Sequence, residues 1–464
     1  ETNDRITAKR FIEKMDSLKI YEFFLISEDE NLLVEVKNKN GFSNCILKLN
    51  HLNHNKTIFN RVFIPIDLID KETVKSFLKR AYTVYTEANT LIERKKAILA
   101  GVHGIITSEP VDLLKCYNEF LKDTQVRDVF FIAHRGLHNG YKESISPENS
   151  LETALYVANS GAEIIEIDVH LTLDDEVVVI HDFKTNRVSK DKRVVSKTTL
   201  NRLEEVKLKK TNVQKGLSQI KSLKDFLTPF KDKDVNFFIE IKPISRKLVI
   251  NTIKVLEELN MKERAVFISF GFKNIVWKKT YLTTINNGYL YSKDFSSNGT
   301  FLDLLIFLIS LDSTFNPQYQ NIKEDIVRKL NNYGITVWPW TVDGIKDIYR
   351  VYTMGVMGIT TNNFDSVKDE FLYLSINENY DYIIGSELEI FVNNYSLSGK
   401  NTQRRGNLML VSDGDTGIRY HKNKIIEAKN EGVAYFYFNV PIKLPNGEKI
   451  NKTTELFKVN VKLK

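Results

Sequence analysis

Two histidines in the middle of the chain each stand beside a second side chain that could do chemistry. His134 is followed by Arg135 and Gly136, and His181 is followed by Asp182. A histidine can act as a base or an acid near neutral pH, an arginine can bind two phosphate oxygens, and a glycine lets the backbone turn close to a ligand. These residues predict acid–base chemistry on a phosphate. Asp182 could orient the histidine or cap a following turn.

A pair of carboxylates and a third, single carboxylate accompany these histidines in the sequence. Glu166 and Asp168 lie two apart in an apolar run, as do Glu240 and Lys242 in the segment FFIEIKP. Side chains two apart on a strand share a face. Three acidic side chains at one place repel each other unless a cation neutralises them, and oxygen ligands favour Ca²⁺ or Mg²⁺ over zinc. The alternative is structural pairing with Lys or Arg. Lys242 could supply a point charge for the phosphate.

Short apolar runs alternate with amphipathic stretches between about residues 127 and 374. The runs are Val129–Ala133, Ile164–Val169, Val177–Ile180, Phe237–Ile241, Ala265–Phe270, Gly288–Tyr291, Ile335–Trp340 and Gly358–Thr361. Strands that alternate with helices predict a parallel sheet, and about eight such units in about 250 residues match a (β/α)8 TIM-type barrel. Active sites of such barrels lie at the C-terminal ends of the strands, which is where both histidines and the acidic residues occur.

The first 125 residues predict an α/β accessory region. The expected elements are a helix at Ala8–Leu18, hairpin strands at Tyr21–Ser27, Leu32–Lys37 and Cys45–Leu49, a strand at Val62–Ile66 and a helix at Lys71–Lys79. Within this region Ala100–Pro110 resembles Met354–Phe364 at an offset of 254 residues. This similarity is either a coincidence within a common pattern or a degenerate copy of the end of a barrel. The first region lacks the histidine, paired acidic and EIK motifs, so we predict that it is catalytically inactive.

The last region changes to short alternating strands separated by Ser-Gly, Asp-Gly and Asn-Gly turns. The expected strands are Glu387–Val392, Asn407–Val411, Val433–Val440 and Leu456–Val461. This pattern predicts a small all-β, sandwich-like domain. We expect it to serve as a binding domain or as a spacer. The predicted organisation is therefore α/β overall, with an accessory region at 1–125, the barrel at 126–376 and a β-rich domain at 377–464.

Composition excludes several classes of protein. The 464 residues are 42% hydrophobic and 27% charged, which is a normal globular balance. A net charge of +7 without a long basic run gives no indication of a nucleic-acid partner. The only two cysteines, Cys45 and Cys116, rule out a disulfide framework and leave one bridge or two buried thiols. No apolar stretch reaches the length of a membrane span. Because the chain begins at Glu1, the lack of a visible signal peptide says little about export.

The motifs together resemble the glycerophosphodiester phosphodiesterase family. The segments HRG, PEN, GAEIIEIDVHLTLDDEVVVIHD, EIK and VWPWTVD…GVMGITT occur in that family's order and spacing, from about Phe130 to Asp369. The resemblance implies that one histidine helps a glycerol hydroxyl to attack the adjacent phosphorus. The other histidine protonates the leaving alcohol, and the cyclic phosphate is then hydrolysed.

The same resemblance implies a role for each matching residue. His134 and His181 are expected to be the general base and acid, Arg135 and Lys242 the phosphate contacts, Asn149 and Trp340 pocket-shaping residues, and Glu166, Asp168 and Glu240 the ligands of one divalent cation, Ca²⁺ or Mg²⁺. Asn149 could equally belong to an ordinary helix start, and Trp340 to the core. Residues 183–220 fit the family's small insertion over the barrel mouth. At Thr361-Asn362-Asn363 the chain departs from the family's Asp-containing turn, which leaves the headgroup preference open.

The resemblance leaves the substrate open between small deacylated headgroups and glycerol-phosphate polymers such as teichoic acid. The extra regions favour a polymer, an extracellular, cell-surface or virion setting such as a phage tail, and envelope-polymer binding by the C-terminal domain. The alternatives are an inactive barrel that serves as a binding or structural protein, and a lyase that stops at the cyclic product.

Overall fold

The computed structural model describes residues 1–18, 20, 23–39, 43–52, 57–137, 146–210, 217–281, 283–293 and 301–464. The chain divides into two units. The first comprises Glu1–Phe63, Phe77–Thr83 and Val129–Val367, and the second comprises Ile64–Ser76, Val84–Asp128 and Lys368–Lys464. The three regions with bounds at 126 and 377 remain a proposal about domain organisation.

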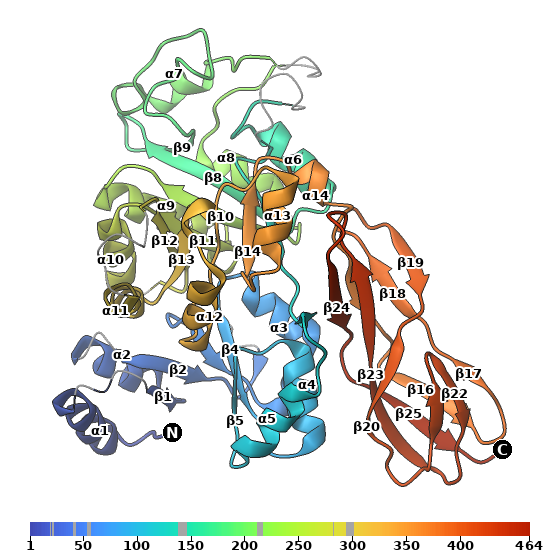
Figure 1. The fold of residues 1–464 in the computed structure, drawn as a ribbon. Helices are drawn as coiled ribbons and strands as arrows, with labels where there is room; N and C mark the ends of the chain where they lie inside the picture. The colour runs from blue at the N-terminus through green and yellow to red at the C-terminus, as the bar shows by residue number, and fades with distance from the viewer. Residues whose placement is uncertain are drawn as a thin grey trace. The chain divides into compact units, whose positions relative to one another are not determined.

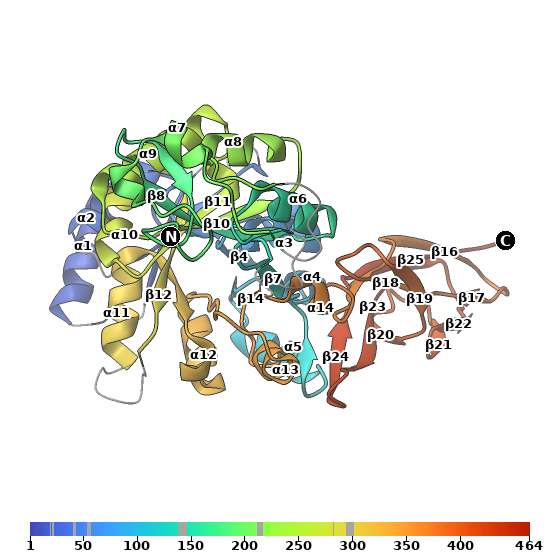
Figure 2. The same ribbon diagram turned by 90° about the horizontal axis from the view of Figure 1, so that it is seen from above.

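The first unit contains a closed barrel, so the predicted (β/α)8 fold is confirmed. Parallel strands run in the order β13-β12-β11-β10-β8-β7-β14. The extended residues 337–340 complete the ring among the described residues, because they bridge to β13 on one side and exchange backbone hydrogen bonds with β14 on the other. Helices α9, α10 and α11 lie outside these strands in both views (Figures 1 and 2). This arrangement brings the C-terminal ends of the strands to one mouth.

The barrel elements follow one another as strand and helix. They are β7 Phe130–Ala133, α6 Leu151–Asn159, β8 Ile164–Leu171, β9 Val177–Val179, α7 Leu200–Glu204, α8 Leu223–Leu227, β10 Asn236–Ile241, α9 Arg246–Glu258, β11 Ala265–Ser269, α10 Phe272–Thr280, β12 Asn286–Tyr291, α11 Phe301–Leu311, β13 Ser313–Pro317, α12 Glu324–Asn332, α13 Ile345–Tyr352, β14 Gly358–Thr361 and α14 Phe364–Val367. Fully buried Trp338 stacks on Phe130 and tilts against Phe238, so aromatic side chains fill part of the core.

One of the eight expected strands was wrong and one was missed. The run Val177–Ile180 is not a barrel strand, because β9 folds back antiparallel on β8. The missing barrel strand is β13, which pairs in parallel with β12. Its sequence, STFNP, carries no apolar alternation, because Ser313, Thr314 and Asn316 are polar yet buried.

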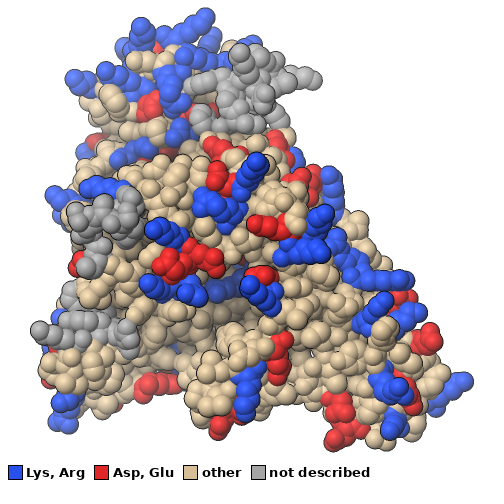
Figure 3. All heavy atoms as spheres, viewed as in Figure 1, with Lys and Arg blue, Asp and Glu red and all other residues tan. Residues whose placement is uncertain are grey.

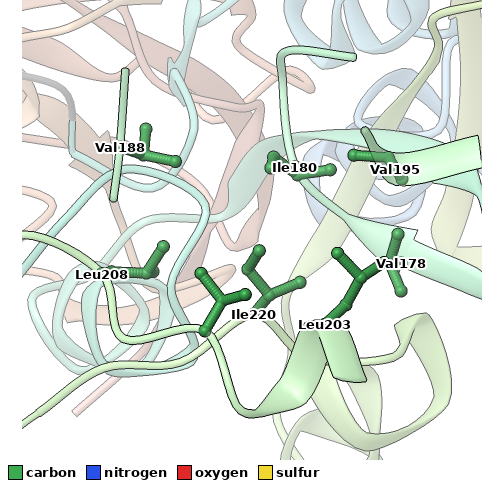
Figure 4. Packing of buried hydrophobic residues seen from close by; sticks show 8 residues of the cluster. Val178, Ile180, Val188, Val195, Leu203, Leu208 and Ile220 are labelled. Atoms are coloured by element: carbon green, nitrogen blue, oxygen red, sulfur yellow. The ribbon is translucent and has the colours of Figure 1, made fainter. Parts of the chain in front are cut away.

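Residues 183–221, which we call the insertion, follow β9 and rise beyond β8 (Figure 1). Val188, Val195, Leu203, Val206, Leu208 and Ile220 of the insertion pack with Val178 and Ile180 into a small apolar cluster (Figure 4). Each buried aliphatic side chain of this size contributes about 1.5–3 kcal/mol. The insertion therefore has a core of its own, continuous with the strand that delivers His181.

The N-terminal part of the first unit contains α1 Arg5–Ser17, β1 Phe24–Ser27, α2 Glu30–Lys39, β2 Asn44–Lys48 and β3 Arg61–Phe63. The expected strand at Leu32–Lys37 was wrong, since these residues belong to α2. Their buried positions, Leu32, Leu33, Val36 and Lys37, recur at helical rather than alternating spacing. The expected hairpin was also wrong. A helix connects β1 and β2, which pair in parallel.

A buried ion cluster joins this N-terminal part to the barrel within the first unit. The Asp312 carboxylate accepts ion pairs from Lys37 at 2.9 Å, Arg61 at 3.3 Å and Lys279 at 2.7 Å. Lys37 also donates to the backbone oxygen of Ile309 at 2.8 Å. Although burial raises the pKa of Asp312, the surrounding cations hold it well below its usual range. One carboxylate thus forms ion pairs with three cationic side chains.

We expect Asp312→Asn to lower the free energy of unfolding by about 3–5 kcal/mol, because it leaves buried cations uncompensated. An acid whose folded-state pKa is lowered stabilises the fold above its unfolded pKa of about 3.9 and loses that contribution as the pH falls further. The difference between wild type and variant should therefore be full near pH 7 and shrink below about pH 4. Urea unfolding at several pH values measures it. The partly exposed Asp347, paired with Arg350, provides a control, and Asp347→Asn should change stability by less than about 1 kcal/mol.

The second unit combines βα elements with a strand-rich part. Its elements are most of α3 Lys71–Leu78, then β4 Thr83–Glu87, α4 Leu91–Ala100, β5 Gly104–Ile106, α5 Pro110–Asn118 and β6 Thr124–Gln125, followed by β15 Tyr373–Ser375, β16 Asn379–Ile383, β17 Leu388–Glu389, β18 Val392–Tyr395, β19 Asn401–Arg404, β20 Asn407–Ser412, β21 Arg419–His421, β22 Lys424–Glu427, β23 Gly432–Lys443, β24 Lys449–Thr453 and β25 Phe457–Lys462. The C-terminal part is built of strands, as predicted. Strand β6 adds in parallel to β24.

The segment from β4 to α5 has the same order of elements as the end of the barrel. Helices α4 and α13, strands β5 and β14, and helices α5 and α14 each begin 254 residues apart. Gly101 and Gly355, also separated by that offset, both have positive φ angles after their helices. These correspondences favour the degenerate-copy interpretation over coincidence.

Both cysteines are buried and free. In the described part of the chain, no helix is both long enough and apolar enough to cross a membrane.

Candidate active site at the barrel mouth

His134 and Arg135 leave the end of β7 in a tight turn. Arg135 and Gly136 have φ angles of 52° and 79°, and a Cβ on the glycine would lie 2.7 Å from Thr153 Cγ2. This unusual backbone turns the Arg135 N–H toward Glu166, whose Oε2 accepts its hydrogen bond at 2.9 Å. Strain of this kind is common at functional sites. The turn therefore joins the first histidine to the first acidic strand.

Glu166, Asp168 and Glu240 form a buried acidic triad. Strands β8 and β10 pair with Asp168 opposite Glu240, and one carboxylate oxygen from each of the three residues lies within 4.8 Å of the others. Burial, followed by the neighbouring carboxylates, raises the pKa of Glu166 well above its usual value. Burial and Asp168 raise the pKa of Glu240 to about 7. Removing like charges from water without a partner is costly, so this site is unfavourable without a cation.

The donor set fits a hard divalent cation. All three side chains offer oxygen, as Ca²⁺ and Mg²⁺ prefer. Asp168 Oδ1 is buried and accepts no hydrogen bond from the described residues, and Lys242 Nζ lies 3.5 Å from it. An acceptor left in this state is available for a ligand. Because these residues fit the ion, we infer that they would hold it.

Lys242 and Arg135 balance part of the negative charge of the acidic triad. Lys242 Nζ lies 2.9 Å from Glu240 Oε1, and Arg135 Nε lies 3.4 Å from Asp168 Oδ2. Although burial raises the pKa of Asp168, Lys242 and Arg135 lower it to about 2. The pKa values of Arg135 and Lys242 are themselves raised by the surrounding carboxylates against the effect of burial. Asp168 is therefore the permanent anion of the triad.

His181 is held on both ring nitrogens. Lys242 Nζ donates to Nε2 at 3.0 Å, so Nδ1 carries the ring proton and donates it to Asp182 at 2.6 Å. Burial lowers the pKa of His181, which keeps the imidazole neutral in this arrangement. Asp182 thus lies where it can orient the histidine.

A polar network behind the histidine includes residues that the sequence did not identify. Arg187 of the insertion donates to Asp182 at 2.6 Å and binds both carboxylate oxygens of Glu148, at 2.6 and 2.7 Å. Glu148 also accepts a hydrogen bond from Arg135 Nη1 at 3.0 Å. Glu148 lies in the PEN motif, from which a role was predicted only for the neighbouring Asn149. Nothing in the sequence pairs it with Arg187.

His134 is positioned by the turn that follows the neighbouring strand β14. Its Nδ1 lies against Asn362 Oδ1. The amide group of Asn362 donates to Asp343 at 2.6 Å, so its oxygen faces the histidine as acceptor. The ring then presents Nε2, which lies 3.8 Å from Glu166 Oε2. Asn362 belongs to the turn that differs from the family pattern, and in this chain it orients the first histidine.

Asn149 and Trp340 both lie at the site. Asn149, with a φ angle of 54°, donates through Nδ2 to Asp168 at 2.9 Å and accepts from the Asp168 backbone at 3.2 Å, so it positions Asp168. Trp340 packs edge-on against Phe270, and its Nε1 donates to the backbone oxygen of Asn316.

Several of the side chains described above line one cavity of about 220 Å³. Its lining residues are His134, Arg135, Glu166, His181, Glu240, Lys242, Ile268, Phe270, Leu290, Asn316, Trp340, Thr341 and Thr360. One side is charged and the other is apolar and aromatic. A polar group with an adjoining carbon chain would fit such a pocket.

Comparisons with known proteins agree with this geometry. The model of the glycerophosphoryl diester phosphodiesterase family matches residues 134–366. A glycerophosphodiester phosphodiesterase of Caldanaerobacter subterraneus is 30% identical over 243 residues, which cover 50% of this chain and 93% of that protein. One of Bacillus subtilis is 23% identical over 252 residues, which cover 50% of this chain and 83% of that protein.

Among solved structures, similar ones are also named as phosphodiesterases. A putative glycerophosphoryl diester phosphodiesterase from Silicibacter pomeroyi matches with a TM-score of 0.45 at 20% identity, covering 50% of this chain and 90% of its own. An Oleispira antarctica phosphodiesterase, solved in complex with sn-glycerol-3-phosphate, matches with a TM-score of 0.43 at 18% identity, covering 51% and 94%. The family model spans half of the sequence and its bounds include every predicted site residue, so this chain belongs to the glycerophosphoryl diester phosphodiesterase family.

Proposed function

We propose that this protein hydrolyses glycerophosphodiesters in the barrel-mouth cavity by acid–base catalysis with His134 and His181. The observation that carries the proposal is that both histidines, Arg135, Lys242, Glu166 and Glu240 line one cavity, with Asp168 completing the acidic triad beside them. A structural ion-pair network would not require two histidines, each oriented through Nδ1 by its own polar partner.

The reaction begins with a glycerol hydroxyl next to the phosphate. One histidine takes its proton as the oxygen attacks phosphorus. The other, which enters the step as an imidazolium favoured by the anionic phosphate beside it, gives a proton to the leaving alcohol. Because the nucleophile belongs to the substrate, proximity supplies a large part of the rate. Water then opens the cyclic phosphate with the two histidines in exchanged roles.

The surrounding residues stabilise charge and orientation. Arg135 and Lys242 lie where their N–H groups can bind the phosphoryl oxygens as negative charge develops. A divalent cation, Ca²⁺ or Mg²⁺, held by Glu166, Asp168 and Glu240 would add Lewis-acid stabilisation of the same charge. Phe270 and Trp340 offer an apolar wall for the carbon skeleton of the substrate.

The substrate class and setting are part of the proposal. The additional βα and strand-rich elements exceed what a small-headgroup hydrolase needs, which supports a polymeric glycerol-phosphate substrate and an extracellular or surface setting. In that setting the strand-rich C-terminal region would bind an envelope polymer.

Phosphorus NMR of glycerophosphocholine incubated with the protein and Ca²⁺ or Mg²⁺ tests the reaction. We expect glycerol phosphate to accumulate as the end product while the diester signal disappears. Accumulation of a stable cyclic phosphate would instead identify a lyase, and an unchanged diester would contradict the proposed activity on small substrates.

A further inference from the structure

The positive charge of the chain is concentrated in the insertion, residues 183–221. This segment contains twelve Lys and Arg but only three Asp and Glu, a net charge of +9, whereas the whole chain carries +7. The rest of the chain is therefore slightly acidic, at −2. Figure 3 shows Lys and Arg gathered over this part of the molecule, at the top of the view. One short segment thus makes a localised positive potential.

Most of these cations are exposed and are not used in folding. Within the described residues of the insertion, eight exposed Lys and Arg side chains form no ion pair: Lys184, Lys190, Lys192, Lys197, Arg202, Lys207, Lys209 and Lys210. The apolar cluster beneath them already holds the segment together. Like charges brought this close repel each other, so their concentration opposes stability and calls for an external anion.

The insertion is physically continuous with the catalytic site. It begins directly after His181 and Asp182, and its Arg187 is anchored to Asp182 and Glu148 by short ion pairs. Arg135, which lines the cavity, shares Glu148 with it. The insertion is therefore joined to the cavity wall through Arg187, Glu148 and Arg135.

We propose that the exposed cations of the insertion bind the flanking phosphates of a glycerol-phosphate polymer while one phosphodiester of that polymer lies in the cavity. The inference rests on the proposed function and assigns the residues that bind its polymeric substrate outside the cavity. A single headgroup diester carries one negative charge, for which Arg135 and Lys242 suffice. A polymer carries one charge per repeat, and lysines on flexible stems bind such charges without requiring a fixed geometry.

A polymer fits the surface better than an anionic bilayer does. Elements that lie on membranes combine cations with an apolar face. In the described part of the insertion the only large hydrophobic side chains that are exposed are Phe183 and Leu217. Six of its aliphatic residues pack together in the apolar cluster: Val188, Val195, Leu203, Val206, Leu208 and Ile220 (Figure 4). One polymer molecule can also occupy both the cationic surface and the cavity.

Charge reversal at Lys190, Lys192 and Lys197 tests the proposal. With poly(glycerol phosphate) at 20 mM salt, we expect the triple Lys→Glu variant to raise KM about tenfold with kcat nearly unchanged, and raising salt to 200 mM to reduce the difference between wild type and variant. Kinetics on glycerophosphocholine should stay at the wild-type values. The matched control reverses Lys122, Lys231 and Lys254, which are also exposed and change the net charge equally; its polymer KM should rise less than twofold.

Binding of fluorescently labelled poly(glycerol phosphate), followed by anisotropy, separates this inference from the proposed catalysis. The insertion variant should bind at least tenfold more weakly than the control whether or not either protein cleaves the polymer. Equal binding by both variants would overturn the inference. It would also be overturned if the insertion variant lost binding to phosphatidylglycerol vesicles but kept wild-type kinetics on the polymer, since the surface would then serve a membrane.

Discussion

His134→Ala and His181→Ala should each lower kcat for glycerophosphocholine about 10²–10⁴-fold, the usual contribution of a positioned acid or base. Each substitution removes a ring held by its own polar partner, Asn362 for His134 and Asp182 for His181. Since the two rings act in the same proton transfers, the double variant should lose little more than the worse single variant. Substrate binding should change less, because Arg135 and Lys242 remain in place.

Steady-state kinetics on purified variants measures this effect, with thermal unfolding to confirm the fold. His421→Ala is the matched control, because His421 is exposed in the strand-rich part of the second unit, and its kcat should equal that of the wild type. Wild-type cleavage by either His134→Ala or His181→Ala would show that the acid–base assignment is wrong.

The second large effect concerns the acidic triad. We expect Asp168→Asn to lower metal-supported kcat/KM by about 10³-fold, because Lewis-acid stabilisation is worth several kcal/mol. Asp168 is the member of the triad whose pKa is lowered, to about 2, so it carries the most persistent negative charge for a cation. Added Ca²⁺ or Mg²⁺ should raise the melting temperature of the wild type and leave that of Asp168→Asn nearly unchanged.

Glu240→Gln separates cation binding from stability. The Glu240 pKa is raised to about 7 by burial and by Asp168, so without a cation this group favours the unfolded chain increasingly as the pH rises from about 4.3 to 7. The metal-free variant should therefore be at least as stable as the metal-free wild type at pH 8, yet gain less from added cation. A variant that gains as much as the wild type would contradict a role for Glu240 in the site.

Local patterns in the sequence were sufficient to predict the acidic strand ends. Glu166 and Asp168 share a face because a strand alternates, and the following histidine motif marks the same barrel mouth. The register that sets Glu240 opposite Asp168 follows from the barrel once both strands are recognised. Strand β13 could not be recognised in this way, because three of its five buried positions are polar and it pairs with a neighbouring strand that only the fold provides.

Asp182 was recognised beside His181, but the more distant groups around the histidines, Asn362, Arg187 and Glu148, were beyond reach for a different reason. Asn362 is 228 residues from His134, and Arg187 meets Glu148 across 39 residues, so neither contact leaves a local pattern. The segment Leu32–Lys37 illustrates the opposite failure. Its Val and Leu content favoured a strand, but packing buried the residues at helical spacing.

The most direct test of the account is the rate of glycerophosphocholine cleavage by the wild-type protein before and after removal of divalent cations with a chelator. We predict loss of activity in the chelator and recovery when Ca²⁺ or Mg²⁺ is restored in excess, with no recovery in Asp168→Asn. An undiminished rate in the chelator would contradict the assignment of Glu166, Asp168 and Glu240 as the ligands of a catalytic cation.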